Sequence, residues 1–289
     1  MDNLRGAAWM TAAMLGFAVE DMFIKLLAGS LPTWQIILIL GMGGGLAFGL
    51  AARAQGQRLF SRAALSPAVL MRNTGEVLGT LGFVTAIALI PLSTASAVLQ
   101  ATPLVVTLGA ALFLGEAVGW RRWSAIFAGF IGVLLVIRPG MEGFDLYSLF
   151  ALQAVIGLAI RDLATRRVPR TISTEQLSFW AFLVLIPAAL LLGAVLGAPP
   201  VRPQGWDWLY IGFAIPLSVF AYYAIVAAMR VGEVSFVTPF RYSRILFALV
   251  FGMAVFGERP DALMLVGAAL IVASGLFTLW RERKHRSSA

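Results

Sequence analysis

Charged and polar residues that interrupt long apolar segments are the residues of this sequence whose types could support chemistry. An ionisable side chain is costly to bury in a membrane, so it is a candidate for function unless another charge neutralises it. Three groups qualify, namely Glu20, Asp21 and Lys25, then Arg72, Asn73 and Glu76, and finally Arg241 and Arg244.

The first group, near the N-terminus, has two interpretations. Asp21 and Lys25 are spaced i,i+4 and can neutralise each other on one face of a helix. As a structural ion pair they would only hold that helix in place. With Glu20 beside them, the same charges could instead form a gate or take part in a proton-linked step.

The second group contains an acid that lies deeper in the membrane. Arg72 is close enough to a helix end for its long side chain to reach the polar interface. Glu76, one turn after Asn73, could bind a substrate ammonium or carry a proton. It could equally pair with Arg72 at i,i+4, and both interpretations stay open.

The third group consists of two arginines in one apolar segment. Arg241 and Arg244 have no acidic residue within reach in their own helix, so a partner must come from another helix or from a substrate. A substrate carboxylate suits a fixed guanidinium, which offers several donors in one plane. Pairing of one of the two with Glu76 is the alternative.

Aromatic residues with a polar tip occur at a similar depth in the predicted helices. The candidates are Trp180, Tyr222, Tyr223 and Tyr242. Such side chains can stack on a flat ring or hold a cation. As a group they predict a lined substrate pocket, whereas any single one of them could simply pack in the core.

Catalytic and metal-dependent functions have no support in the sequence. It has no cysteine, and its single histidine, His285, lies in the basic tail. We therefore predict no enzyme activity, no catalytic residue, no metal and no cofactor. The net charge of +8 comes from short Arg clusters between apolar runs, which is typical of membrane topology signals and not of nucleic-acid binding.

The elements that must position these residues are transmembrane helices. Hydrophobic residues make up 60% of the 289 residues and charged ones 12%, whereas soluble domains carry about 25% charged residues. Since about 20 apolar residues cross a bilayer, the sequence predicts an all-α integral membrane protein with ten spans. They are 6–27, 32–52, 66–90, 93–114, 121–138, 145–164, 174–197, 206–229, 233–256 and 262–281.

Basic residues alternate between successive loops. One set of loops carries Arg clusters around 53–62, 121–122, 161–170 and 281–286, and the other set carries only scattered basic residues. By the positive-inside rule, both termini are cytoplasmic. We expect a multi-pass protein of a bacterial inner membrane, with lipid as its surrounding partner.

The chain also repeats itself at about half its length. Gly16–Asp21 resembles Gly157–Asp162, 141 positions later, and Gly115-Glu116 recurs as Gly257-Glu258 after 142 positions. Each half, 1–142 and 143–289, holds five spans, and an odd number inverts the second half in the membrane. Inverted repeats are common in secondary transporters, with the substrate site near the midplane between the halves.

The ends of the two halves resemble a known superfamily. Pro239–Ser243, Phe256–Pro260 and the small-residue run Gly267–Gly275 look like the last two helices of the drug/metabolite transporter superfamily, and Pro103–Glu116 is their degenerate partner in the first half. The resemblance covers essentially the whole chain. It is strongest to the ten-helix EamA-type members, and among these to the YddG-type exporters of aromatic and other amino acids.

This resemblance implies that spans 1–4 and 6–9 surround a central cavity, that spans 5 and 10 are peripheral, and that no nucleotide drives transport. It implies a secondary-active, alternating-access exporter of small metabolites, above all neutral amino acids and also flat organic cations. A different metabolite, an intramembrane enzyme and a scaffold subunit are the alternatives. A monomer and a homodimer are both compatible with the sequence.

Overall fold

The computed structural model describes residues 2–60, 62–115, 119–141, 144–169, 171–232 and 234–286. Within these ranges every regular element is a helix, as the all-α prediction requires. The predicted turn residue Glu116 and the predicted boundary between the halves at 142/143 lie outside them.

The long helices begin and end within a few residues of the predicted spans. In chain order the elements are α1 (Asn3–Leu27), α2 (Thr33–Ala54), η1 (Arg62–Leu65), α3 (Pro67–Leu89), α4 (Leu92–Leu99), α5 (Thr102–Phe113), α6 (Trp120–Ile137), α7 (Ser148–Thr165), α8 (Thr174–Leu196), α9 (Trp206–Val231), α10 (Val234–Val237), η2 (Thr238–Tyr242), α11 (Ser243–Phe256) and α12 (Ala262–Arg286). Eight segments of the described chain are long and apolar enough to cross a membrane. Helices α1 and α3 are equally long but carry the first two charged groups, which lower their hydropathy.

Local sequence explains where individual helices begin and end, and α8 is a clear case. Ser173 Oγ accepts a hydrogen bond from Gln176 N at 3.1 Å, while Gln176 Oε1 accepts one from Ser173 N at 3.0 Å. This capping box satisfies two amides that the first turn leaves without partners. At the other end Gly197 adopts φ 61°, a left-handed conformation that terminates the helix.

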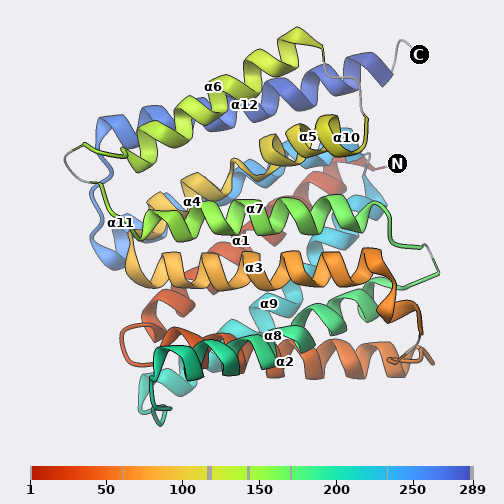
Figure 1. Cartoon of the computed structure of the whole chain (residues 1–289), viewed down its shortest axis with the longest axis vertical. Coiled ribbons are helices and arrows are strands. Elements are labelled where there is room, and N and C mark those ends of the chain that lie inside the picture. The colour runs from red at the N-terminus through yellow and green to blue at the C-terminus, as the bar shows by residue number, and fades with distance from the viewer. Residues whose placement is uncertain are drawn as a thin grey trace.

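The helices lie roughly parallel or antiparallel in one bundle (Figure 1). The most extensive contacts join α3 to α7, α1 to α9, α2 to α8 and α6 to α12. Each of these pairs takes one helix from either half of the chain. Helices α6 and α12 form one edge of the bundle, α2 lies at the opposite edge, and the two termini lie at the same end (Figure 1).

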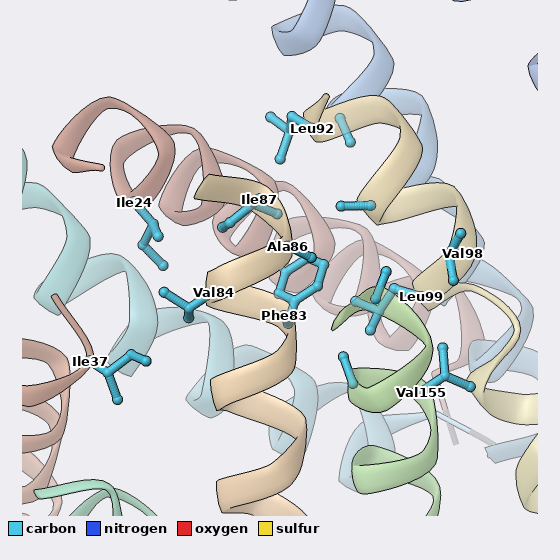
Figure 2. Packing of buried hydrophobic residues seen from close by; sticks show 14 of the residues in the cluster. Ile24, Ile37, Phe83, Val84, Ala86, Ile87, Leu92, Val98, Leu99 and Val155 are labelled. Atoms are coloured by element: carbon cyan, nitrogen blue, oxygen red, sulfur yellow. The ribbon is translucent and has the colours of Figure 1, made fainter. Parts of the chain in front are cut away.

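Apolar side chains from both halves fill the space between the central helices. Ile24 of α1, Ile87 of α3, Leu92 of α4 and Val155 of α7 belong to one buried cluster (Figure 2). All four are at most 3% exposed. This core keeps α1, α3, α4 and α7 in contact around the charged residues that α1, α3 and α7 carry.

Glycine allows the closest of these helix contacts. A side chain on Gly157 of α7 would overlap the backbone of α3 at Gly79, and one on Gly82 would lie 2.7 Å from Phe150 O. Small residues let two helix backbones approach closely within a membrane. The contact fixes the distance between α3 and α7, and both helices carry residues of the polar cluster described below.

Two helices are interrupted, and the interruptions meet. The predicted fourth span is divided into α4 and α5 at Gln100, and the predicted ninth span begins as α10 and the 3-10 turn η2 before α11. Gln100 Nε2 donates a hydrogen bond to Arg241 O of η2 at 3.3 Å. These residues are 141 positions apart, which is the spacing of the internal repeat. Discontinuous helices of this kind mark substrate sites in transporters with inverted repeats.

Candidate functional site

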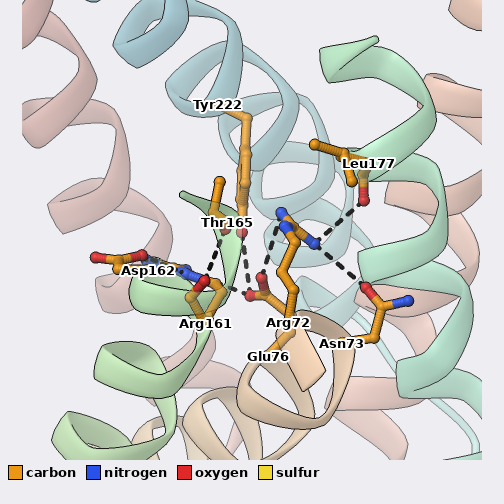
Figure 3. A network of polar contacts seen from close by, with 8 residues as sticks. All are labelled: Arg72, Asn73, Glu76, Arg161, Asp162, Thr165, Leu177 and Tyr222. Atoms are coloured by element: carbon orange, nitrogen blue, oxygen red, sulfur yellow. Dashed lines mark hydrogen bonds and ion pairs between the residues drawn. The ribbon is translucent and has the colours of Figure 1, made fainter. Parts of the chain in front are cut away.

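Glu76 of α3 lies at the centre of a buried polar cluster (Figure 3) and is 4% exposed. Tyr222 Oη of α9 donates a hydrogen bond to Glu76 Oε1 at 3.2 Å, and Arg161 Nη1 of α7 lies 3.6 Å from the same oxygen. Arg72 Nη2, one turn earlier on α3, lies 3.9 Å from Glu76 Oε2. One carboxylate therefore faces two guanidinium groups and a phenol from three helices.

Arg72 is itself anchored by neighbouring oxygen atoms. Its Nη1 donates to Asn73 Oδ1 and to Leu177 O of α8, each at 3.3 Å. The side chain is buried and directed toward Glu76, so it does not extend to the membrane interface. The i,i+4 pairing of Arg72 with Glu76, one of the two open interpretations, is present in the structure.

Arg161 links Glu76 to a second acid. Its Nη2 and Nε each lie 2.8 Å from Asp162 Oδ1. Arg161 was predicted to be one of the basic loop residues, but α7 continues past it to Thr165 and keeps it inside the bundle. The internal repeat was the signal that could have identified it, because Arg161 and Asp162 align with Glu20 and Asp21.

Asp21 pairs with Arg244 of α11, and the predicted i,i+4 pair with Lys25 does not form. Arg244 Nη2 lies 2.7 Å from Asp21 Oδ2 and 2.9 Å from Oδ1, and its Nε lies 3.1 Å from Oδ2. The guanidinium also lies 5.0 Å from the ring centroids of both Phe17 and Phe83. A planar guanidinium between two rings matches a carboxylate with two bonds, a geometry that an ammonium group cannot provide.

Lys25 instead binds backbone carbonyl oxygens at the end of α3. Its Nζ donates to Ile87 O at 2.9 Å and to Ile90 O at 2.6 Å. A cation at a helix C-terminus is favourable because the last carbonyl groups lack helical partners. Lys25 is therefore spatially separate from the Glu76 cluster.

Arg241 lies beside the cluster without a close acid. Among the described residues, no carboxylate oxygen is within 4.0 Å of its guanidinium, and the acid that acts on its charge is Asp162. The predicted pairing of Glu76 with Arg241 or Arg244 is wrong, because Arg72 and Arg161 occupy the space around Glu76.

Glu20 is the remaining intramembrane acid of the first group. It is 7% exposed and lies beside the hydroxyl of Ser218 of α9. This contact has a counterpart in the other half, since Glu20 aligns with Arg161 at a spacing of 141 and Glu76 aligns with Ser218 at a spacing of 142. The helix pairs α1–α9 and α7–α3 thus place polar groups at equivalent positions.

Tyr222 also packs against three aromatic rings next to the cluster. Its ring centroid lies 5.7 Å from that of Phe17, 6.0 Å from Phe48 and 5.4 Å from Phe182, all with edge-on geometry. These rings come from α1, α2 and α8, while Tyr222 comes from α9. Polar and aromatic surfaces therefore meet at Tyr222, whose hydroxyl contacts Glu76.

The other three predicted aromatic residues lie elsewhere. Tyr223 is 62% exposed and packs edge-on against Trp9, because consecutive helical residues point about 100° apart. Trp180 is buried, and its Nε1 donates to Leu59 O at 2.7 Å, which ties α8 to the loop before η1. Tyr242 is buried against α12, and its hydroxyl has no partner among the described residues.

In the described part of the chain, no three His, Cys, Asp or Glu side chains lie close enough together to hold a metal ion. The cluster instead offers fixed guanidinium donors, carboxylate acceptors and a phenol, groups that bind polar or charged organic molecules. Buried charges between the two halves of a membrane-spanning helical bundle are typical of membrane transporters built from repeats.

The chain belongs to the EamA-like transporter family, whose sequence pattern matches residues 4–138 and again residues 146–280. It is therefore a small-molecule transporter and not an enzyme, and it is a multi-pass protein of the bacterial inner membrane. A solved crystal structure has the same fold, with a TM-score of 0.59 and 22% identity over 94% of this chain and 98% of the other.

Relatives of this chain are named for different substrates. A riboflavin transporter of Vibrio cholerae is 30% identical over 98% of this chain and 96% of its own length. A pseudopaline exporter of Pseudomonas aeruginosa is 26% identical over 93% of this chain and 94% of its length. An S-adenosylmethionine uptake transporter of Rickettsia felis is 25% identical over 68% of this chain and 66% of its length.

Proposed function

We propose that this protein is a ten-span, alternating-access carrier whose substrate binds at the cluster around Glu76. Counting α1 and α3 with the eight apolar segments gives ten crossings. The Arg-rich loops after α2 and α7 lie at the same end of the bundle as the termini, which supports a cytoplasmic location for that end (Figure 1). The two separate family matches support repeats over 1–142 and 143–289.

The observation that carries the proposal is that both halves of the chain build the cluster. Glu76 comes from the first half, and its partners Arg161 and Tyr222 come from the second. A substrate that inserts between these groups would replace contacts across the interface of the halves. Binding would then alter the contacts that hold the halves together, which is what a carrier needs to couple binding to a conformational change.

We propose a flat, polar aromatic metabolite of the riboflavin class as the substrate. The full-length relative named for riboflavin supports this choice. So does the meeting of the rings of Phe48, Phe182 and Tyr222 with polar groups, because a flat ring system can stack on aromatic side chains while its edge accepts and donates hydrogen bonds.

Export of neutral or aromatic amino acids is the second candidate, and one specific observation favours it. Arg241 has no carboxylate within 4.0 Å among the described residues, so it could bind a substrate carboxylate. Glu76 Oε2, which accepts no hydrogen bond among the described residues, could accept one from the ammonium group in place of its long contact with Arg72. Such a substrate needs one site of each sign, and Arg241 and Glu76 supply them.

Counterflow in proteoliposomes distinguishes these substrates and does not depend on the direction of net transport. Vesicles containing purified protein are loaded with unlabelled riboflavin, tryptophan or S-adenosylmethionine, and uptake of the same labelled compound is measured. Saturable uptake of riboflavin that internal riboflavin stimulates supports the first proposal. The same behaviour with tryptophan alone supports the second. Linear, unsaturable leak of every compound would overturn the carrier mechanism.

Two substitutions test the assignment of the site. Glu76→Gln removes the charge that Arg72 and Arg161 face. Arg241→Ala removes the guanidinium that is the candidate hydrogen-bond donor to a substrate carboxylate. If Glu76 and Arg241 bind substrate, counterflow of the transported compound loses saturation in its normal concentration range. Normal counterflow by both variants would exclude the cluster as the binding site.

A further inference from the structure

Glu258, in the turn between α11 and α12, binds the N-terminus of α4 in the other half of the chain. Leu92 N donates to Glu258 Oε1 at 2.5 Å, and Ser93 N donates to Oε2 at 3.0 Å. Ser93 Oγ donates to the same Oε2 at 2.6 Å. A carboxylate at a helix N-terminus satisfies free amides and interacts favourably with the helix dipole.

The sequence around Glu258 is adapted to this contact. Gly257 adopts φ 63° and ends α11, which reverses the chain so that Glu258 N donates to Gly252 O at 2.9 Å. A side chain on Gly252 would overlap the Glu258 carboxylate. Gly252 therefore leaves the space through which the carboxylate reaches α4, and Gly257 supplies the left-handed conformation that aims it.

Lys25 binds the opposite side of the turn from α3 to α4, the turn whose α4 end Glu258 contacts. Its Nζ binds Ile87 O and Ile90 O at the C-terminus of α3, just before Pro91 and the start of α4. Lys25 and Glu258 also attract each other electrostatically. The turn from α3 to α4 is thus held between a cation from α1 and an anion from the second half.

We infer that Lys25 and Glu258 form a polar clamp that keeps the pathway closed at the end of the bundle opposite the termini, here called the far end. Opening there requires Glu258 to release α4, so both residues position α4 during transport. This inference rests on the alternating-access mechanism proposed above. Both side chains are only half-buried, so water can solvate them when the clamp opens.

The absence of cysteine from the natural chain allows a substrate-independent test of the clamp. Ser96 of α4 is 1% exposed and lies one turn after Ser93, so Ser96→Cys provides a single buried thiol. Labelling by a membrane-impermeant maleimide is measured from each side of the vesicle. Glu258→Gln and Lys25→Met should each raise labelling from the far end about five-fold, because loss of a charge-assisted contact shifts the closed–open equilibrium.

Asp261→Asn is the matched control. It removes an acid from the same turn, but Asp261 contacts Arg138 and the start of α12 and not α4. Labelling of Ser96→Cys in the Asp261→Asn background should stay at the starting level. Equal labelling of the Glu258→Gln, Lys25→Met and Asp261→Asn proteins would overturn the clamp.

A cross-link separates gating from structural support. In a Ser93→Cys/Glu258→Cys protein, a short reducible bis-thiol cross-linker replaces the polar contact with a covalent one. Cross-linking should abolish counterflow, and reduction should restore it. Undiminished counterflow by fully cross-linked protein would disprove the clamp while leaving the carrier proposal intact. A wild-type protein that transports none of the compounds would count against the carrier proposal, and maleimide labelling would still decide the clamp.

Discussion

Asp21 of α1 and Arg244 of α11 are 223 positions apart in the sequence and form a two-pronged ion pair inside the bundle. Asp21 is 2% exposed, so water contributes little to its stabilisation. Its carboxylate depends on Arg244, and the guanidinium in turn lies between two aromatic rings. The pair is a charged connection between the two halves that is independent of the Glu76 cluster.

Asp21→Asn should destabilise the protein strongly. The substitution leaves the Arg244 guanidinium buried without its counter-charge, and breaking a buried pair in this way costs about 3–5 kcal/mol. The melting temperature of the purified protein in detergent measures the effect. Asp21→Asn/Arg244→Gln removes both charges and should melt above the single Asp21→Asn variant. A single variant that melts like the wild type would show that the pair contributes nothing to stability.

Tyr222→Phe should weaken transport without unfolding the protein. It deletes the hydroxyl that contacts Glu76. In the proposed site the substrate replaces Glu76 as the partner of this hydroxyl, and loss of one hydrogen bond of about 1.5 kcal/mol should raise the KM for counterflow about ten-fold. Tyr223→Phe is the matched control, because the neighbouring ring is exposed and faces away from the cluster. A similar KM for Tyr222→Phe and Tyr223→Phe would remove Tyr222 from the site.

Gly157→Ala should disrupt the packing of α7 on α3. The new methyl group would overlap the backbone of Gly79, which cannot move aside as a flexible side chain can. The substitution should therefore lower the free energy of unfolding by about 2 kcal/mol or more, since overpacking costs about 1–3 kcal/mol. Thermal denaturation and the yield of monodisperse protein report the loss. Gly212→Ala in α9 is the control, since nothing lies within 4 Å of its added methyl group. An equal effect of both substitutions would contradict the packing argument.

The lowered pKa of Asp261, at the far end of the bundle, predicts a small pH dependence of thermal stability. Its hydrogen bond from Arg138, and then that from Met264 N, hold the pKa of this carboxyl below its usual value. A lowered folded-state pKa gives stability that is present above the unfolded pKa of about 3.9 and is lost as pH falls through the folded pKa. The difference in melting temperature between wild type and Asp261→Asn should therefore shrink between pH 7 and pH 3. A difference that grows on acidification would reverse the assigned sign.

Hydropathy and turn residues predicted the helices well, because crossing a bilayer demands a long apolar segment whatever its partners are. The interruption at Gln100 was not predicted. Pro103, in the first turn of α5, was the sequence signal that could have identified it, because proline lacks the backbone N–H of a continuous helix and clashes with the preceding turn. Orientation of the termini follows from loop charges alone and stays a prediction.

Partners of the charged residues were harder to predict than the residues themselves. The i,i+4 rule favoured Lys25 for Asp21, but a guanidinium from a helix more than 200 positions away has the better geometry. The same rule offered Arg72 as one of two possible partners of Glu76, and the structure contains that pair. Spacing describes one helix at a time, so it cannot rank a local partner against one that tertiary packing brings in.

The contacts Arg161–Glu76 and Glu20–Ser218 occupy equivalent positions in the two helix pairs, but their charges differ. One position carries an ion pair, and its counterpart carries an acid beside a hydroxyl. If the halves exchange conformations, the inward-facing and outward-facing forms cannot be isoenergetic. The carrier then has a preferred resting orientation, and its apparent affinity for one solute differs between the two faces of the membrane.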